Sequence, residues 1–214
     1  MSEQRVVICL CGSLAGGKTT LIRRLSQALH GASTLLFDEY DAYGEWPSDM
    51  AGWLAEGCDP GQVRVPRLRQ DVDALLRGEA VKHPKSESPI HPSDILLVED
   101  PFGRTRPDIQ QLYELVLYVD LPPDLSVVRM AQRALGLGLN AADDPFEALS
   151  RDELATRCRT AQGWLSIYAL LRDMYTVLAA PVRASADVVL DGRKPPDDLL
   201  EDALAAIGER GYGR

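Results

Sequence analysis

The sequence predicts an α/β fold whose five-stranded, mostly parallel sheet is flanked by helices. Short apolar runs rich in β-branched residues alternate along the chain with longer stretches of helical periodicity. Parallel strands that are buried on both faces give continuous apolar runs, and their connections are usually helices. The chain has 214 residues, so we expect one domain over residues 1–214.

Five apolar segments fit the strand pattern. The first, residues 6–10, is followed by glycines and then by a helical pattern that begins near Lys18. This order is typical of a buried parallel strand that leads through a loop into a helix. The other four predicted strands are residues 34–37, 95–98, 115–119 and 187–190.

Helical spacing and turn signals account for most of the remaining chain. The pattern loosens over residues 44–61, where we expect loops and at most one short helix, and the proline-containing residues 82–92 predict an irregular connection. Residues 135–144 are rich in Gly, Ala and Asp, which suits a mobile segment. Besides the helix near Lys18, helices are predicted at 67–76, after Pro122-Pro123, at about 151–178 and at 195–207.

The composition excludes several classes of partner. A formal net charge of −9 argues against a non-specific nucleic-acid binder, whereas a small anion needs only a focused site of backbone N–H groups and a few cations. We see no signal-peptide pattern and no apolar run of membrane-spanning length. The sequence therefore predicts a cytoplasmic protein without nucleic-acid or membrane partners, and it leaves the oligomeric state open, a homodimer included.

Residues 12–19 match the phosphate-binding loop (P-loop) pattern G-x-x-x-x-G-K-[ST] between a predicted strand and a predicted helix. Glycines let backbone N–H groups turn inward around phosphates, and the helix N-terminus adds a partial positive charge. In this motif the lysine, Lys18, bridges the β- and γ-phosphates, and the Thr19 hydroxyl is a ligand of Mg²⁺. We therefore expect ATP and Mg²⁺ as cofactors, with ATP bound by Gly12, Ser13, Leu14, Ala15, Gly16, Gly17, Lys18, Thr19 and Thr20.

Acidic residues follow two of the predicted strands at their carboxyl ends, where parallel sheets bind ligands. Asp38 is placed to accept a proton from an acceptor hydroxyl or to hold a water on Mg²⁺, with Glu39 and Asp41 as nearby competitors. One of Glu99 and Asp100 is expected to order the hydration shell of Mg²⁺. The alternative for each residue is a solvated or capping carboxylate.

Arg129 and Arg133 are four residues apart and so share one face of a predicted helix. We expect them to carry positive charge toward the transferring phosphate, although surface salt bridges explain the spacing equally well. Their position just before residues 135–144 favours a lid at about residues 133–150 that closes over ATP.

Aromatic side chains near Asp38 are candidates for the wall of an acceptor pocket, because they stack on planar or sugar faces. Packing in the core explains them nearly as well. The candidates are Tyr40, Tyr43, Trp46 and Trp53, of which Tyr40 and Tyr43 are predicted to contact the substrate together with Asp38.

With these residues in place, the chain resembles the uridine kinase, phosphoribulokinase and pantothenate kinase group of P-loop kinases. Residues 10–20 are similar to that group's G-G-S-x-x-S-G-K-T-T loop, with Gly16 where the group often has serine. Residues 76–81 resemble its L-x-x-G-x-x-V stretch, and residues 181–189 resemble its closing P-x-x-x-x-A-D-x-x motif. The resemblance implies the P-loop NTPase fold with a small lid.

Two further segments carry residues with a role in that group. Phe37-Asp38-Glu39-Tyr40 is similar to its D-x-[FY]-Y segment, which implies that Asp38 is the general base. Val98-Glu99 resembles the start of its V-E-G motif, with Asp100 in place of the glycine, which implies that Glu99 serves the metal.

These observations predict a kinase that transfers the γ-phosphoryl group of ATP to a hydroxyl of a small metabolite such as a nucleoside, vitamin or sugar. Its predicted catalytic residues are Lys18, Asp38, Arg129 and Arg133, and its metal residues are Thr19 and Glu99. The acceptor stays open, because the group's Y-D-x-x-x-H-x-R segment after Val81 is not present here.

Two alternatives remain from the sequence. A nucleoside-monophosphate kinase would need further phosphate-binding arginines, for which Arg67, Arg104 and Arg106 are the candidates. A nucleotide-dependent regulatory switch or ATPase would bind and hydrolyse ATP without a small acceptor.

Overall fold

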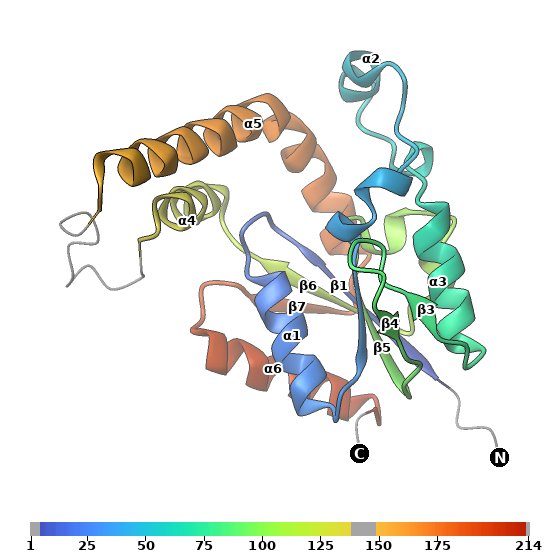
Figure 1. Ribbon diagram of the computed structural model, residues 1–214. Coiled ribbons are helices and arrows are strands. Elements are labelled where there is room, and N and C mark those ends of the chain that lie inside the picture. Colours follow the sequence, from blue (N-terminus) through green and yellow to red (C-terminus); the bar gives the residue numbers. More distant parts are fainter. Residues whose placement is uncertain (1–4, 138–148, 213–214) are drawn as a thin grey trace.

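The computed structural model describes residues 5–137 and 149–212 and is built on a five-stranded parallel sheet (Figure 1). The spatial order of the strands is β2-β5-β1-β6-β7, and each neighbouring pair is parallel. The predicted sheet is confirmed, and the strand bounds differ from the predicted ones by one or two residues. The strands are β1 (Val6–Gly12), β2 (Ser33–Leu36), β5 (Ile95–Glu99), β6 (Leu115–Asp120) and β7 (Val188–Asp191).

Strand β1 lies at the centre of the sheet because it is apolar on both faces. Successive side chains of a strand point to opposite faces. Ile8 and Leu10 therefore join the apolar cluster on one face, whereas Val7, Cys9 and Cys11 join the cluster on the other. All five are at most 1% exposed, so the interior of β1 is buried on both faces.

Helices cover both faces of the sheet. On the face of Ile8 and Leu10 pack α1 (Lys18–Ala28) and α6 (Pro196–Glu209), whose apolar residues recur at helical spacing. The opposite face is covered by α3 (Pro66–Leu76) and the C-terminal part of α5 (Arg151–Ala184). The buried residues on these helices are Leu21, Ile22 and Leu25 of α1, Leu199, Ala203 and Ile207 of α6, Leu68 and Val72 of α3, and Met174, Leu178 and Val182 of α5.

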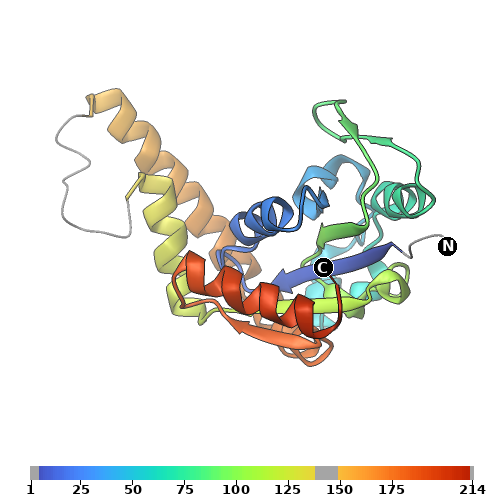
Figure 2. The ribbon, with the colours of Figure 1, turned by 90° about the horizontal axis from the view of Figure 1, so that it is seen from below.

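Helix α4 (Pro123–Leu135) packs against α5, and Figures 1 and 2 show the two side by side, projecting away from the sheet. Of the predicted lid at residues 133–150, residues 138–148 lie outside the described residues. Helix α5 begins at a capping box formed by Ser150 and Glu153. It continues past the predicted end at residue 178 because Val182, one turn further, is buried in the core and stabilises the turn that contains Pro181.

The proline-containing residues 82–92 are more ordered than the sequence predicts. They contain a hairpin of β3 (Val81–Lys82) and β4 (Pro89–Ile90), paired antiparallel. The backbone N–H of His83 donates to the carbonyl oxygen of Ser88 at 2.8 Å, and Glu87 closes the turn with a φ of 61°. Proline is compatible with the first position of a strand, so Pro89 does not prevent the pairing. The loosely patterned region before it contains one short helix, α2 (Met50–Ala55).

Helix α5 alone, among the described residues, is long and apolar enough to cross a membrane by length and composition, with a mean hydropathy of 1.2 over its most apolar 18 residues. This differs from the expectation that no segment has that character. The criterion does not by itself place the helix in a membrane, because core helices of soluble proteins also meet it. Only 17% of that window is buried, although the C-terminal turns of α5 pack on the sheet.

Gly12, where β1 ends, provides a test of this fold. It has a φ of 127°, and a Cβ there would lie 2.6 Å from the backbone nitrogen of Val119 in β6. We expect Gly12→Ala to lower the free energy of unfolding by about 2 to 5 kcal/mol, from left-handed strain and overpacking. Urea denaturation monitored by circular dichroism measures this free energy of unfolding. Gly163→Ala is the matched control: its Cβ meets open space within α5, and we expect it to raise stability by about 0.5 to 1 kcal/mol. Equal effects of the two variants would contradict the structure.

Candidate active site

The predicted site residues meet at the edge of the sheet formed by the carboxyl ends of the strands. The P-loop follows β1, and the last residue of β5, Glu99, pairs in register with Leu10 of β1. Glu99 also pairs with Leu36, the last residue of β2, after which the chain continues to Asp38. Three polar segments that are far apart in sequence are thereby adjacent in space.

The conformation of the loop from Gly12 to Gly17 is fixed by hydrogen bonds of Ser13 and by two residues with positive φ. Ser13 donates its N–H to the carbonyl oxygen of Val119 at 2.9 Å, and the Ser13 hydroxyl accepts from Leu121 N–H at 3.0 Å. Ala15 and Gly17 have φ values of 53° and 94°. Gly17 precedes α1 and offers no side-chain cap, so the first N–H groups of the helix have no partner within it. This geometry fits a phosphate.

Lys18 directs its ammonium group over this loop. Its Nζ donates to the carbonyl oxygens of Gly12 at 3.1 Å and Ser13 at 3.0 Å. These carbonyls are neutral, so the positive charge of Lys18 is not neutralised by either of them. A phosphate that accepts from the loop N–H groups would therefore also meet a cation.

Thr19 and Glu99 form the candidate metal site. The Thr19 hydroxyl donates to Oε2 of Glu99 at 3.0 Å, and Glu99 is 8% exposed. Burial raises the pKa of the Glu99 carboxyl, with the charges of Asp38 and Glu39 adding to the rise, whereas Lys18 and the Thr19 hydrogen bond oppose it. A hydroxyl and a carboxylate in contact are the oxygen donors that suit Mg²⁺.

Asp38 lies in the short 3₁₀ turn Phe37–Glu39 that follows β2, with its side chain exposed. Its negative charge adds to the raised pKa values of Glu99, Asp41 and Tyr175, so its carboxylate lies near all three of these groups. Glu39, by contrast, is already in contact with His83, with 3.1 Å between Oε2 and Nε2.

The β3–β4 hairpin covers this turn, which the sequence did not reveal. Lys85 Nζ donates to the carbonyl oxygen of Asp38 at 2.9 Å. Nδ1 of His83 accepts from the N–H groups of Lys85 and Ser86, at 3.2 Å and 3.1 Å. Because Nδ1 is an acceptor, a neutral His83 carries its proton on Nε2, the nitrogen that lies 3.1 Å from Oε2 of Glu39. His83 was without an assigned role in the sequence, since only the hairpin brings it to Glu39.

The four aromatic candidates divide into two groups. Tyr40 is 1% exposed, and its hydroxyl donates to Oδ2 of Asp71 at 3.0 Å; Trp53 is 2% exposed and donates to a backbone carbonyl. The structure thus places the Tyr40 ring in the core, away from any bound molecule, which differs from the expected substrate contact. Tyr43 and Trp46 are 40% and 41% exposed beside Asp38 and are open to a ligand.

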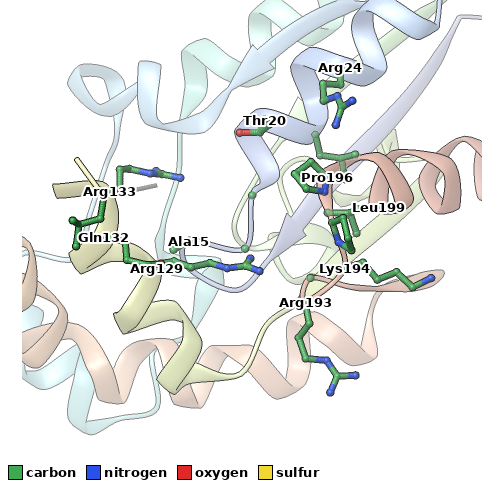
Figure 3. Close-up of a pocket in the computed structure, with 16 residues that line it drawn as sticks. Ala15, Thr20, Arg24, Arg129, Gln132, Arg133, Arg193, Lys194, Pro196 and Leu199 are labelled. Carbon is green, nitrogen blue, oxygen red and sulfur yellow. The ribbon is translucent and has the colours of Figure 1, made fainter. Parts of the chain in front are cut away.

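A cavity of about 600 Å³ adjoins the P-loop, between α1, α4 and α6. Arg129 and Arg133 line it from α4, and Figure 3 shows the Arg129 side chain extending along the loop at Ala15, with Arg133 further from that residue. Within residues 5–137 and 149–212 neither arginine forms a salt bridge. The lining that the sequence did not point to consists of Leu21, Arg24, Gln132, Leu137, Gly192, Arg193, Lys194, Pro195, Pro196 and Leu199. Gly192 to Pro195 follow the last strand, and parallel sheets bind ligands beyond the carboxyl ends of their strands. That position was the sequence signal that could have identified these four residues.

The three arginines of the monophosphate-kinase alternative are engaged elsewhere. Arg67 binds both carboxylate oxygens of Asp71 at 2.8 Å and 3.0 Å. Arg104 pairs with Asp187 at 2.7 Å. Arg106 is fully buried. None of the three is directed at the P-loop as an unpaired cation.

No family model matches the chain. The curated uridine kinase of Ligilactobacillus salivarius is 23% identical over 199 residues, covering 86% of this chain and 84% of that protein. The uridine kinase of Halobacterium salinarum is 20% identical over 221 residues, covering 96% and 89%. Among solved structures, a possible uridine kinase from Bacillus stearothermophilus is 20% identical with a TM-score of 0.44, covering 87% of this chain and 89% of that one.

The complete P-loop motif thus follows the central strand of a parallel sheet, as the sequence predicted. The curated relatives that match the chain over most of its length are kinases. Fold and relatives agree with the resemblance found in the motifs: the chain is similar to curated uridine kinases over most of its length, and these relatives support an enzyme that phosphorylates a small molecule.

Proposed function

We propose that the enzyme transfers the γ-phosphoryl group of ATP, with Mg²⁺, to a hydroxyl of a small metabolite, with a nucleoside such as uridine as the first acceptor to test. The observation that carries this proposal is the meeting of Lys18, the Thr19–Glu99 pair and Asp38 at one edge of the sheet, beside a cavity of about 600 Å³. Phosphoryl transfer needs these parts: an anion cradle, a metal site and a carboxylate near the acceptor.

On the nucleotide side, the loop N–H groups and Lys18 hold the phosphates, and the cavity between α1, α4 and α6 holds the nucleoside part of ATP. Arg129 and Arg133 enter that cavity from α4 and neutralise charge that develops on the transferring group. Thr19 and Glu99 hold Mg²⁺, which neutralises phosphate charge when it is bound.

On the acceptor side, Asp38 accepts the proton of the attacking hydroxyl. Its carboxylate is exposed, whereas Glu39 is engaged with His83, so Asp38 is the carboxylate of this turn that is open to a substrate and adjacent to Glu99. Tyr43 and Trp46 present aromatic faces beside it. We therefore retain Tyr43 as a substrate contact and assign Tyr40 to the support of the turn through Asp71.

An acceptor screen separates this proposal from the regulatory switch. ADP release from ATP and Mg²⁺ is followed with panels of nucleosides, nucleoside monophosphates, vitamins and sugars. A kinase for small alcohols shows acceptor-dependent ADP release, and nucleoside monophosphates are expected to be poor acceptors because Arg67 and Arg104 are paired. A switch would show no stimulation by any acceptor, together with partner binding that differs between ADP and a non-hydrolysable ATP analogue.

Lys18 is the residue whose loss should be most severe. Lys18→Ala removes the cation over the loop, and we expect acceptor-dependent ADP release to fall by about 10³-fold or more, since one such contact to the transition state is worth several kcal/mol. Steady-state kinetics measure this. Lys82→Ala, which removes a surface lysine paired with Glu87, is the matched control and should retain full activity. Near-normal turnover by Lys18→Ala would contradict the proposal.

Asp38→Asn should affect the chemical step and spare nucleotide binding. The amide has nearly the same shape but does not accept the proton, so we expect kcat to fall by about 10²- to 10⁴-fold. The affinity for a fluorescent ATP analogue should change little. Asp41→Asn, in the next turn, is the control and should retain kcat. If Asp41→Asn loses kcat and Asp38→Asn does not, the base has been assigned to the wrong carboxylate.

A further inference from the structure

Arg106 is a buried cation that the proposed chemistry does not use. Its side chain is 0% exposed, and none of its three guanidinium nitrogens has a hydrogen-bond partner in the part of the chain that is described. Its nearest charges are Oδ2 of Asp100 and Oδ1 of Asp108, each at 3.4 Å. Burying a charged group without hydrogen bonds lowers the free energy of unfolding, and replacing a buried ion pair with hydrophobic residues often leaves stability unchanged or raises it. Fold stability alone therefore does not explain Arg106.

The contacts of Arg106 show what it connects. Its Cζ lies 5.5 Å from the ring centre of Phe37, over the face of the ring. Phe37 and Asp100 are the residues that follow the paired strand ends Leu36 and Glu99. Arg106 thus contacts Phe37, which precedes Asp38, and Asp100, which follows Glu99.

Asp100 is fixed from its other sides. Its Oδ1 accepts from Phe102 N–H at 3.0 Å, and its Oδ2 accepts from the Tyr113 hydroxyl at 2.8 Å. Asp100 is fully buried, so these two hydrogen bonds and Arg106 hold its carboxyl group in one position. Phe37 is likewise packed edge-on against Phe102, with 5.7 Å between the ring centres. The two strand ends are thereby joined beneath the site by one buried cation.

Resting on the proposed function, we propose that Arg106 and Asp100 are positioning residues that set the separation of Asp38 and Glu99. Neither touches the substrates. Phe37 directly precedes Asp38, and Asp100 directly follows Glu99. A shift of Phe37 or Asp100 would therefore change the distance between the metal-binding oxygens of Glu99 and the proton-accepting carboxylate of Asp38. Loss of a group that orients a metal ligand typically costs about 10- to 100-fold in metal affinity or activity.

The double variant Asp100→Asn/Arg106→Met tests this, because it removes the two fully buried charges together; Asp108, which also faces Arg106, is 29% exposed and stays in contact with water. We expect its urea midpoint to be unchanged or higher, and its affinity for a fluorescent ATP analogue to be unchanged. Mn²⁺ bound in the presence of the non-hydrolysable analogue AMP-PNP, measured by electron paramagnetic resonance, should be about tenfold weaker or more. The kcat with uridine, or with the best acceptor of the screen, should fall by about tenfold or more.

Arg104→Met is the matched control. This arginine belongs to the same loop, but it pairs with Asp187 and with the carbonyl of Tyr113, so we expect reduced stability with unchanged Mn²⁺ affinity and kcat. Phe37→Leu, which keeps apolar bulk but removes the ring beneath the guanidinium, should weaken Mn²⁺ binding like the double variant does.

Two results would overturn the proposal: native Mn²⁺ affinity in the double variant, or a double variant that unfolds in markedly less urea, since the pair would then serve stability. The Mn²⁺ titration does not depend on turnover. If the unmodified enzyme released no ADP with any acceptor, the proposed function would fail, while the metal measurement would still decide whether Arg106 positions Glu99.

Discussion

Strand β1 is buried on both faces by α1 and α6 on one side and by α3 and α5 on the other, and the site depends on this burial. A strand in that position has no solvated side, so polar groups can follow it only where it ends. Its neighbours β5 and β6 run parallel to it, so their ends meet at the same edge. At that edge the backbone of Gly12 packs directly against Val119 of β6, so closely that a Cβ would overlap the β6 backbone. This close packing keeps the P-loop next to β6.

The charges at this edge constrain one another. Burial raises the pKa of Glu99, and the charges of Asp38 and Glu39 add to the rise, whereas Lys18 and the Thr19 hydroxyl lower it. Three carboxylates and one lysine in a small volume leave an excess of negative charge, which a divalent cation would offset. On the acceptor side, His83 and Lys85 of the hairpin contact Glu39 and the backbone of Asp38. The 3₁₀ turn is thus held on one side by the hairpin and on the other by Arg106, which contacts the ring of Phe37.

Much of this arrangement could be predicted from the sequence, for identifiable reasons. Continuous apolar runs such as Val7 to Leu10 are specific to buried parallel strands, and the P-loop pattern gives both its residues and their geometry. Tyr40 was misread as a substrate contact because its partner, Asp71, is on another helix and no local pattern joins them. The β3–β4 hairpin was missed because the three prolines of residues 82–92 suggest irregular structure. The cavity lining from Arg193 to Pro196 depends on the tertiary packing of α6 against α1, and the sequence signalled it only through its place after the last strand.

The central claim is that Lys18, Glu99 and Asp38 serve a single transfer from ATP to an alcohol. Phosphorus-31 nuclear magnetic resonance of the enzyme with ATP, Mg²⁺ and the acceptor panel tests this most directly, because it identifies where the phosphoryl group goes. The account predicts a phosphate monoester of one acceptor, formed in equal amounts with ADP. Intact ATP, or ADP with inorganic phosphate alone whichever acceptor is supplied, would contradict it.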